Sequence, residues 1–256
     1  MNTMKRVGLI GAGTIGRTIL KELQSLPGVE IAFVLVRDPS AHADLGLPEG
    51  CVIADEAVAL ERGADLVVEA AMADTVQRLA PDFLRHGDFC GFSSTALADR
   101  ATEDAVREAA LTHGRRFYVP HGAVLGLDGL GDGQGLIDSV TITTTKSGKS
   151  LGIDPDTEGA IFDGPTRDAC HRFPRNVNVH AAIALAGLGF DRTISRIVAV
   201  PGLVDMKHRI EVTGQGLAWD LGITSRSLGG VTGAYTPRSA AGTVRRILGG
   251  AGVVVA

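Results

Sequence analysis

The stretch Val7-Gly8-Leu9-Ile10-Gly11-Ala12-Gly13-Thr14-Ile15-Gly16 decides the fold of this chain. An apolar run precedes three glycines spaced Gly-x-Gly-x-x-Gly, and a helical pattern follows at residues 18–26. In this setting the first glycine permits a tight turn, the second lets the backbone approach a pyrophosphate, and the third allows close helix–strand packing. The N-terminus of the helix then faces the phosphates. The stretch therefore predicts a dinucleotide site made by Gly11, Gly13, Thr14, Ile15 and Gly16.

Apolar runs alternate with helical patterns through the first 120 residues. Strands are predicted at residues 31–36, 66–70, 89–92 and 116–119, and helices at residues 75–85 and 99–113. Alternation of this kind is typical of βαβ units and a parallel sheet. The fold class is therefore α/β, with an N-terminal Rossmann dinucleotide-binding domain over residues 1–120.

The pattern changes after Pro120. Residues 140–145 (Val-Thr-Ile-Thr-Thr-Thr) alternate like an antiparallel strand with one face in water. Further strands are predicted at residues 194–200 and 208–213, with a small-residue helix at 177–188 between them. We expect a second, α+β domain over residues 121–236 that binds substrate, and its exposed sheet suggests a homodimer. The amphipathic segment 237–248 is expected to pack back on the first domain, to which residues 237–256 are assigned.

The overall charge and the cysteines exclude several classes of protein. The net charge of −4 and the pI near 6.0 provide no basic field for nucleic acid or an anionic membrane. No apolar run approaches the ~20 residues of a membrane span, and the N-terminus lacks the pattern of a signal peptide. We therefore expect a cytoplasmic protein. Cys51, Cys90 and Cys170 form no CxxC pair, which predicts buried structural thiols and no metal site.

The end of the second predicted strand bears on the choice of cofactor. Here the chain reads Val36-Arg37-Asp38-Pro39. An acid at this position binds the ribose 2′-hydroxyl of NAD, and a cation accommodates the 2′-phosphate of NADP. Asp38 could serve the ribose, and Arg37 could contact a phosphate or stack on the adenine. The pair predicts that either NAD or NADP is accepted, and the alternative is two solvated loop charges.

Four further stretches carry a more specific resemblance. They are Val67-Val68-Glu69-Ala70-Ala71, Ser93-Ser94-Thr95-Ala96-Leu97-Ala98-Asp99, Pro120-His121-Gly122-Ala123-Val124-Leu125-Gly126-Leu127-Asp128, and Phe173-Pro174-Arg175-Asn176-Val177-Asn178-Val179 with Leu185-Ala186-Gly187-Leu188-Gly189-Phe190-Asp191-Arg192-Thr193. His208 follows in Lys207-His208-Arg209-Ile210. From about Lys5 to Val212, the chain resembles the L-aspartate dehydrogenase family.

The resemblance implies an activity and the residues that perform it. The reaction is the reversible conversion of L-aspartate to oxaloacetate and ammonia through iminosuccinate, with hydride passing to the nicotinamide. Such an enzyme serves amino-acid metabolism and pyridine nucleotide biosynthesis. By motif position, Ala70 and Ala71 lie where the chain passes the nicotinamide ribose, Ala123 and Asn178 contact the cofactor, and His208 is catalytic.

The chemistry of these residue types agrees with that reaction. An imidazole that titrates near neutrality can accept the amine proton and return protons during imine hydrolysis. Lys207 and Arg209 flank His208 and could help lower its pKa, the alternative being that alternating strand side chains point elsewhere. His180 lies in the alanine-rich helix where the family usually has a small residue, so packing or exposure is expected of it rather than catalysis.

Substrate contacts are predicted at three positions. Lys146 resembles a family lysine and is placed near a substrate carboxylate, the alternative being a solvated charge at a strand end. Asn178 can donate and accept hydrogen bonds, which suits a carboxamide, a ribose or the substrate, and it could also cap a helix. His121 adjoins the Gly122-Ala123 loop, where it either lines the site or has a structural role.

The C-terminal part departs from the family pattern. The family often has Ala-Asp-Pro where this chain has Ala199-Val200-Pro201, and Asn near the histidine where this chain has Met206-Lys207. The usual Asn-Pro-Lys-Thr-Ser stretch of the family is replaced here by residues 234–239. The segment 149–163 is shorter than the corresponding segment of the family. Two alternatives therefore stay open: a dehydrogenase or imine reductase of the same fold for another amino or hydroxy acid, and a non-catalytic NAD(P)-binding sensor.

Overall fold

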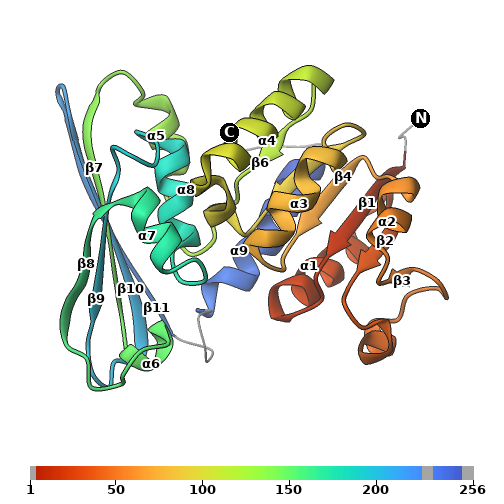
Figure 1. The fold of residues 1–256 in the computed structure, drawn as a ribbon, viewed down its shortest axis with the longest axis horizontal. Coiled ribbons are helices and arrows are strands. Elements are labelled where there is room, and N and C mark those ends of the chain that lie inside the picture. The colour runs from red at the N-terminus through yellow and green to blue at the C-terminus, as the bar shows by residue number, and fades with distance from the viewer. Residues whose placement is uncertain (1–3, 227–232, 250–256) are drawn as a thin grey trace. The chain divides into compact units, whose positions relative to one another are not determined.

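The computed structural model describes residues 4–226 and 233–249 of the chain, which forms two compact units (Figure 1). The first unit comprises Met1–Phe92, Ala105–Pro120 and Pro237–Ala256, and the second comprises Ser93–Asp104 and His121–Thr236. Residues 1–3, 227–232 and 250–256 of the domain ranges predicted from the sequence lie outside the described residues. The two divisions differ at Ser93–Asp104, which groups with the second unit and not with the first.

The first unit is built on a six-stranded parallel sheet in the order β3-β2-β1-β4-β5-β6. This is the strand order of the doubly wound dinucleotide-binding fold, whose ligands bind beyond the carboxyl ends of the strands. The α/β class and the Rossmann domain are thus confirmed. The strands are β1 (Lys5–Ile10), β2 (Val29–Leu35), β3 (Val52–Ile53), β4 (Leu66–Glu69), β5 (Asp88–Gly91) and β6 (Phe117–Tyr118).

Helices cover this sheet and close its core. The strands β1 and β4 are apolar and buried, as expected of parallel strands enclosed on both faces. The amphipathic helix at the C-terminal end joins this core through Ala240 and Val244, which pack with Ile19 and Leu23 of the helix after the glycine turn. The helices are α1 (Thr14–Ser25), the 3-10 helix η1 (Pro39–Leu45), α2 (Glu56–Arg62), α3 (Ala73–Phe83), α4 (Arg100–His113, which begins in the second unit) and α9 (Tyr235–Leu248).

The second unit contains a five-stranded mixed sheet in the order β11-β10-β7-β9-β8. Only β7 and β9 run parallel, and the other pairs are antiparallel. The central strand β7 alternates buried and less buried residues, so one face of the sheet enters a core while the other does not. The strands are β7 (Ile137–Lys146), β8 (Gly159–Pro165), β9 (Ile194–Ala199), β10 (Asp205–Gly214) and β11 (Leu217–Arg226).

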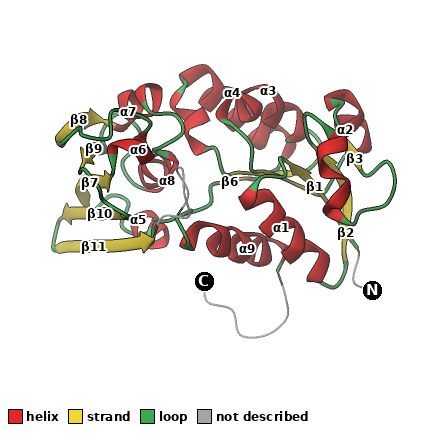
Figure 2. Ribbon diagram, turned by 90° about the horizontal axis from the view of Figure 1, so that it is seen from below, coloured by secondary structure: helices red, strands yellow, loops and turns green. Residues whose placement is uncertain are grey.

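The helices of the second unit lie on one face of its sheet (Figure 2). The apolar face of β7 and β10 packs with Val124, Leu130 and Ile183. Within the described ranges, no helix lies on the opposite face in either view. The helices are the 3-10 helix η2 (Ser94–Ala98), α5 (Leu127–Asp132), α6 (Gly148–Leu151), α7 (Thr166–Arg172) and α8 (Asn178–Ala186).

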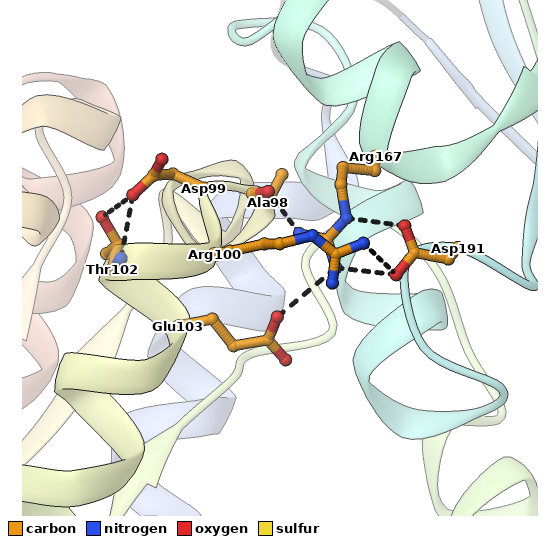
Figure 3. A network of polar contacts seen from close by, with 7 residues as sticks. All are labelled: Ala98, Asp99, Arg100, Thr102, Glu103, Arg167 and Asp191. Atoms are coloured by element: carbon orange, nitrogen blue, oxygen red, sulfur yellow. Dashed lines mark hydrogen bonds and ion pairs between the residues drawn. The ribbon is translucent and has the colours of Figure 1, made fainter.

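Polar contacts explain why Ser93–Asp104 groups with the second unit (Figure 3). The guanidinium of Arg167, at the start of α7, donates to the main-chain carbonyl of Ala98 and pairs with Asp191 at 2.7 Å. The same side chain lies 3.5 Å from the carboxylate of Glu103. Asp99 caps α4, because its Oδ1 accepts from the backbone N–H and the hydroxyl of Thr102, each at 2.8 Å.

No helix in the described part of the chain has both the length and the apolar character needed to cross a membrane.

Candidate functional site

The turn between β1 and α1 uses its three glycines differently. Gly11 has a φ of +91°, and a Cβ there would lie 2.7 Å from the carbonyl oxygen of Ala70. A Cβ on Gly16 would lie 2.1 Å from the carbonyl oxygen of Gly11, so only glycine allows this close approach of helix and strand. By contrast, a Cβ on Gly13 would meet nothing within 4 Å. The turn is therefore tight at its two ends and open in its middle.

The first turn of α1 can bind an anion. Gly13 is the N-cap residue, and no side chain among the described residues caps this helix end. The N–H groups of the first helical turn, which begins at Thr14 and Ile15, are those that a helix leaves without internal partners. Together with the positive end of the helix dipole, they suit a phosphate. The geometry thus fits the pyrophosphate of a dinucleotide.

The end of β4 lies directly against this turn. Ala70 donates its backbone N–H to the carbonyl of Ile10 at 2.8 Å, and its own carbonyl oxygen lies against Gly11. The fully buried carboxylate of Glu69 accepts from the N–H of Ala71 at 2.6 Å. The backbone of Ala70 and Ala71 is therefore held beside the glycine turn.

Arg37 and Asp38 are both exposed just beyond β2, the strand next to β1. Asp38 caps the helix η1: its Oδ1 accepts from the backbone N–H of Ser40 at 3.0 Å and from its hydroxyl at 2.6 Å. These bonds from Ser40 lower the pKa of Asp38. Asp38 is thus an ordered anion with a structural partner, and not a free loop charge.

In the second unit, Lys146 and His208 are buried on the same face of the sheet. His208 lies opposite Thr144 in the antiparallel β7–β10 pair, and Lys146 follows Thr144 by two residues on that face. Lys146 is 3% exposed and His208 4%. The structure therefore brings the predicted catalytic histidine and the predicted substrate lysine into one buried cluster, and Lys146 is not a solvated strand-end charge.

Burial controls the ionisation of this cluster. It lowers the pKa of Lys146 to about 8. Burial first, and then the charge of Lys146, lowers the pKa of His208 to about 3. Of the two alternatives for Lys207 and Arg209, the second holds: both are exposed and, as alternate strand residues, point to the other face, so they do not cause this shift in pKa. At neutral pH the free protein therefore has a neutral imidazole beside a lysine that still carries its charge.

A line of hydrogen bonds leads from His208 into the core. The Oγ1 of Thr144 lies 2.8 Å from Nδ1 of His208 and 2.6 Å from Nε2 of His180. The Nδ1 of His180 lies 2.8 Å from the hydroxyl of Ser195, which lies 2.8 Å from that of Thr166. Nε2 of His208 has no hydrogen-bond partner in the described part of the chain. That nitrogen is thus left for a ligand.

Asn178 is the first residue of α8, the helix that also carries His180. Its Oδ1 accepts from the backbone N–H of Thr95 at 3.2 Å, which identifies this atom as the amide oxygen. The hydroxyl of Thr95 lies 3.0 Å from the same oxygen. Asn178 therefore anchors η2 to α8, and its amide NH₂ makes no hydrogen bond to the other described residues. It does not cap α8, whose N-cap is Val177.

The loop with His121 and Ala123 is packed on the same helix. Gly122 has a φ of +58°, and a Cβ there would lie 3.5 Å from Cγ1 of Val179. Nδ1 of His121 lies 2.8 Å from the carbonyl of Val124, an acceptor, so this nitrogen carries the proton. The ring also stacks on Tyr235. Ala123 is buried beside it.

The residues that connect these groups were not among those predicted from the sequence. Thr144 could have been found, because it precedes Lys146 by two residues on a strand and so shares its face. Ser195 and Thr166 come from other elements, and no spacing in the sequence indicates that they meet His180. The three cysteines are free and buried, as predicted. The described residues contain no group of three or more His, Cys, Asp or Glu side chains that could hold a metal ion.

Family comparisons cover nearly the whole chain. Residues 129–247 match the family described as aspartate dehydrogenase, C-terminal, and residues 11–120 match the NAD-binding domain of homoserine dehydrogenase. The first unit is therefore a pyridine-nucleotide-binding domain.

Individual aspartate dehydrogenases are similar to this chain in sequence and in fold. The L-aspartate dehydrogenase of Methanococcoides burtonii is 34% identical over 230 residues, 83% of this chain and 84% of that protein. L-aspartate dehydrogenase 1 of Bordetella pertussis is 36% identical over 227 residues, 84% of each chain. The crystal structure of aspartate dehydrogenase from Thermotoga maritima has a TM-score of 0.79 at 24% identity, covering 98% of this chain and 99% of that one. A putative myo-inositol dehydrogenase from Sinorhizobium meliloti shares the fold with a TM-score of 0.54.

Proposed function

Because the chain belongs to the L-aspartate dehydrogenase family, we propose that it interconverts L-aspartate with oxaloacetate and ammonia through iminosuccinate, using NAD or NADP. The observation that carries this proposal is the buried pair of Lys146 and His208. A cation and a neutral base on one buried sheet face suit a substrate that offers both a carboxylate and an amine.

The turn from Gly11 to Gly16 would hold the cofactor pyrophosphate, with the open position at Gly13 leaving room for it. Ala70, Ala71, Ala123 and Asn178 would contact the rest of the cofactor. The NH₂ of Asn178, which donates to none of the other described residues, can donate to a carbonyl or a ribose oxygen. When bound, the nicotinamide accepts the hydride that leaves Cα of the substrate. Asp38 would serve the ribose of NAD, and Arg37 the 2′-phosphate of NADP.

His208 would move the protons of the reaction. The amine of aspartate must lose its charge before Cα can release a hydride, and the lone pair of Nε2 accepts that proton. Water then adds to the imine carbon, the C–N bond breaks and ammonia leaves. After Nε2 has released the amine proton to solvent, His208 removes a proton from the water and returns it to the departing nitrogen.

The substrate itself would adjust the basicity of His208. In the free protein the charge of Lys146 contributes to the low pKa of His208. A substrate carboxylate on Lys146 neutralises that charge and adds negative charge nearby, and both changes raise the pKa of an imidazole. The base thus becomes stronger when a dicarboxylate is bound, which favours aspartate over amino acids without a second acid.

Lys146 and His121 are the proposed substrate contacts. Lys146 is buried and has no carboxylate partner in the described part of the chain, so a substrate carboxylate would supply one. His121 is held by Val124 and stacked on Tyr235, which gives its ring a defined orientation. Asn178 would contribute to substrate binding as well.

We also propose that the protein is a homodimer. The support is the face of the second unit's sheet on which the described residues place no helix. Sedimentation equilibrium tests this proposal. A mass of two chains is expected, and a single chain at micromolar concentration would contradict it.

Initial rates with oxaloacetate, ammonia and each reduced cofactor test the function. We expect cofactor oxidation that depends on both substrates. Turnover with other keto acids but not oxaloacetate would favour the alternative dehydrogenase or imine reductase. Cofactor binding without turnover of any amino or keto acid would favour a sensor.

A further inference from the structure

His180 lies at the centre of a hydrogen-bonded line that no part of the proposed reaction uses directly. Its side chain is fully buried, and both ring nitrogens have partners: Nδ1 lies 2.8 Å from Ser195 and Nε2 lies 2.6 Å from Thr144. The line continues past Ser195 to the hydroxyl of Thr166, which donates to the main-chain carbonyl of Thr193 at 2.9 Å.

The carbonyl of Thr193 gives the line a direction, because a carbonyl oxygen can only accept. If the single hydroxyl proton of Thr166 goes to Thr193, Ser195 must donate its own proton to Thr166. The oxygen of Ser195 then accepts from His180, so the proton of neutral His180 is on Nδ1. Each step follows from the number of protons that a hydroxyl or a neutral imidazole carries.

The same counting reaches His208. Nε2 of His180 is left as an acceptor, so Thr144 donates its hydroxyl proton to it. The oxygen of Thr144 then accepts from Nδ1 of His208, 2.8 Å away. Nδ1 of His208 is therefore protonated, and Nε2 holds the lone pair. Reversing the whole line would lose the hydrogen bond from Thr166 to Thr193 and would protonate Nε2 of His208.

We propose that His180 is a positioning residue, which together with Thr144, Ser195 and Thr166 holds His208 in the Nδ1–H tautomer, so that Nε2 stays basic. The catalytic meaning of this tautomer rests on the proposed function, whereas the tautomer itself does not. This arrangement requires a neutral His180. A doubly protonated ring would donate from Nε2 to Thr144, and the hydroxyl of Thr144 would then donate to Nδ1 of His208 instead of accepting from it. Burial keeps it neutral by lowering its pKa.

A purely structural role would not need this arrangement. The neighbours of His180 in α8 are the small residues Ala181, Ala182 and Ala184. A small side chain would leave the hydroxyl of Thr144 free to donate to Nδ1 of His208, which would place the proton of His208 on Nε2. This chain instead provides an acceptor for that hydroxyl.

The test reads the tautomer directly, by long-range ¹H–¹⁵N correlation in protein labelled with ¹⁵N-histidine. The chain has seven histidines, and the signal of His208 is identified by its absence from His208→Gln. We expect Nδ1–H in the wild type at pH 7. An Nε2–H signal for wild-type His208 would overturn the proposal, whatever the enzyme assays show.

Two nearly isosteric variants then break the line. Thr166→Val removes the bond that sets its direction, and Ser195→Ala removes the acceptor of His180. Both should move His208 toward Nε2–H and lower kcat about 10-fold or more, the scale on which an orienting partner of a functional histidine acts, with KM little changed. Ser139→Ala, which removes an exposed hydroxyl bonded to Thr213 on the same sheet, is the matched control and should change neither.

His180 itself is tested by replacement and rescue. His180→Ala should shift the tautomer and lower kcat, whereas in His180→Gln the amide oxygen can accept from Thr144 and should restore part of both. Folded variants that keep Nδ1–H on His208 would refute the role of His180. If the wild type turns over no aspartate but shows the tautomer shifts, the proposed function fails while the positioning line stands.

Discussion

Lys146 and His208 lie on adjacent strands of one buried sheet face, and the charge of the lysine adds to burial in lowering the pKa of the histidine. Neither group has an acidic partner among the described residues. The pair is consequently suited to a ligand that brings negative charge, because such a ligand satisfies the lysine and strengthens the base at the same time.

Replacing His208 should stop proton transfer and leave cofactor binding in place. His208→Ala is expected to lower turnover by ~10²-fold or more, the usual contribution of general acid–base catalysis. Cofactor affinity, measured by fluorescence titration, should change little, because the glycine turn belongs to the first unit. Near-normal turnover would remove His208 from the catalytic role.

Lys146 should bind substrate only while it is charged. Its pKa in the free protein is about 8, so KM for aspartate should rise as the pH passes from 7 to 9 and the ammonium loses its proton. Lys146→Met should raise KM at pH 7 and remove this dependence. Lys149→Met, an exposed lysine three residues away, is the control and should behave like the wild type. A pH-independent KM in the wild type would contradict the assignment.

Asp38 should select for NAD through its charge. Asp38→Ala should weaken NAD more than NADP, because the bond to the ribose 2′-hydroxyl is lost. Asp38 also caps η1, so Asp38→Asn, which can keep an acceptor for the N–H of Ser40, separates the two roles. Dissociation constants for both cofactors provide the measurement. Equal losses for NAD and NADP would show that Asp38 does not serve the ribose.

The two buried histidines should make the protein acid-sensitive. Both have folded pKa values below the unfolded value, so the unfolded chain binds more protons and the free energy of unfolding falls as the pH drops below about 6.5. For His208 this loss continues down to its folded pKa of about 3. Each histidine contributes a slope of ~1.4 kcal/mol per pH unit inside its window.

Urea titrations between pH 4 and pH 7 measure that slope. In His208→Gln, the slope of the unfolding free energy against pH should be smaller by about the contribution of one histidine. His113→Gln, at an exposed position, should leave the slope unchanged. A His208→Gln variant with the full wild-type slope would show that His208 is not buried in its neutral form.

Much of the fold could be predicted because its signals are local. The glycine turn, the apolar runs of β1 and β4 and the pattern of α9 each lie within a few consecutive residues. Three strands were not predicted. β3 (Val52–Ile53) has only two residues, too few to show an alternating pattern. β8 (Gly159–Pro165) contains Gly, Asp and Pro, which are uncommon in strands. The third is β11 (Leu217–Arg226), although that strand alternates regularly.

The candidate site divides in the same way. The roles of Lys146, Asn178 and His208 could be predicted from the sequence, because each residue lies in a stretch that resembles the family. The direction of the pKa shift at His208 was also expected, but its cause was not. Lys207 and Arg209 are adjacent in sequence yet point away, whereas Lys146 is distant in sequence and adjacent on the sheet.

The sequence by itself determined the dinucleotide turn, the family and the residue types that serve the reaction, since these depend on short spacings along the chain. Only the tertiary structure decided that His180, Thr144, Ser195 and Thr166 form one hydrogen-bonded line to His208. Those residues come from α7, α8 and three strands, and hydrogen bonds depend on distances in space that the order of the chain does not reveal. The ionisation of the site was likewise decided by burial, which exists only once the chain has folded.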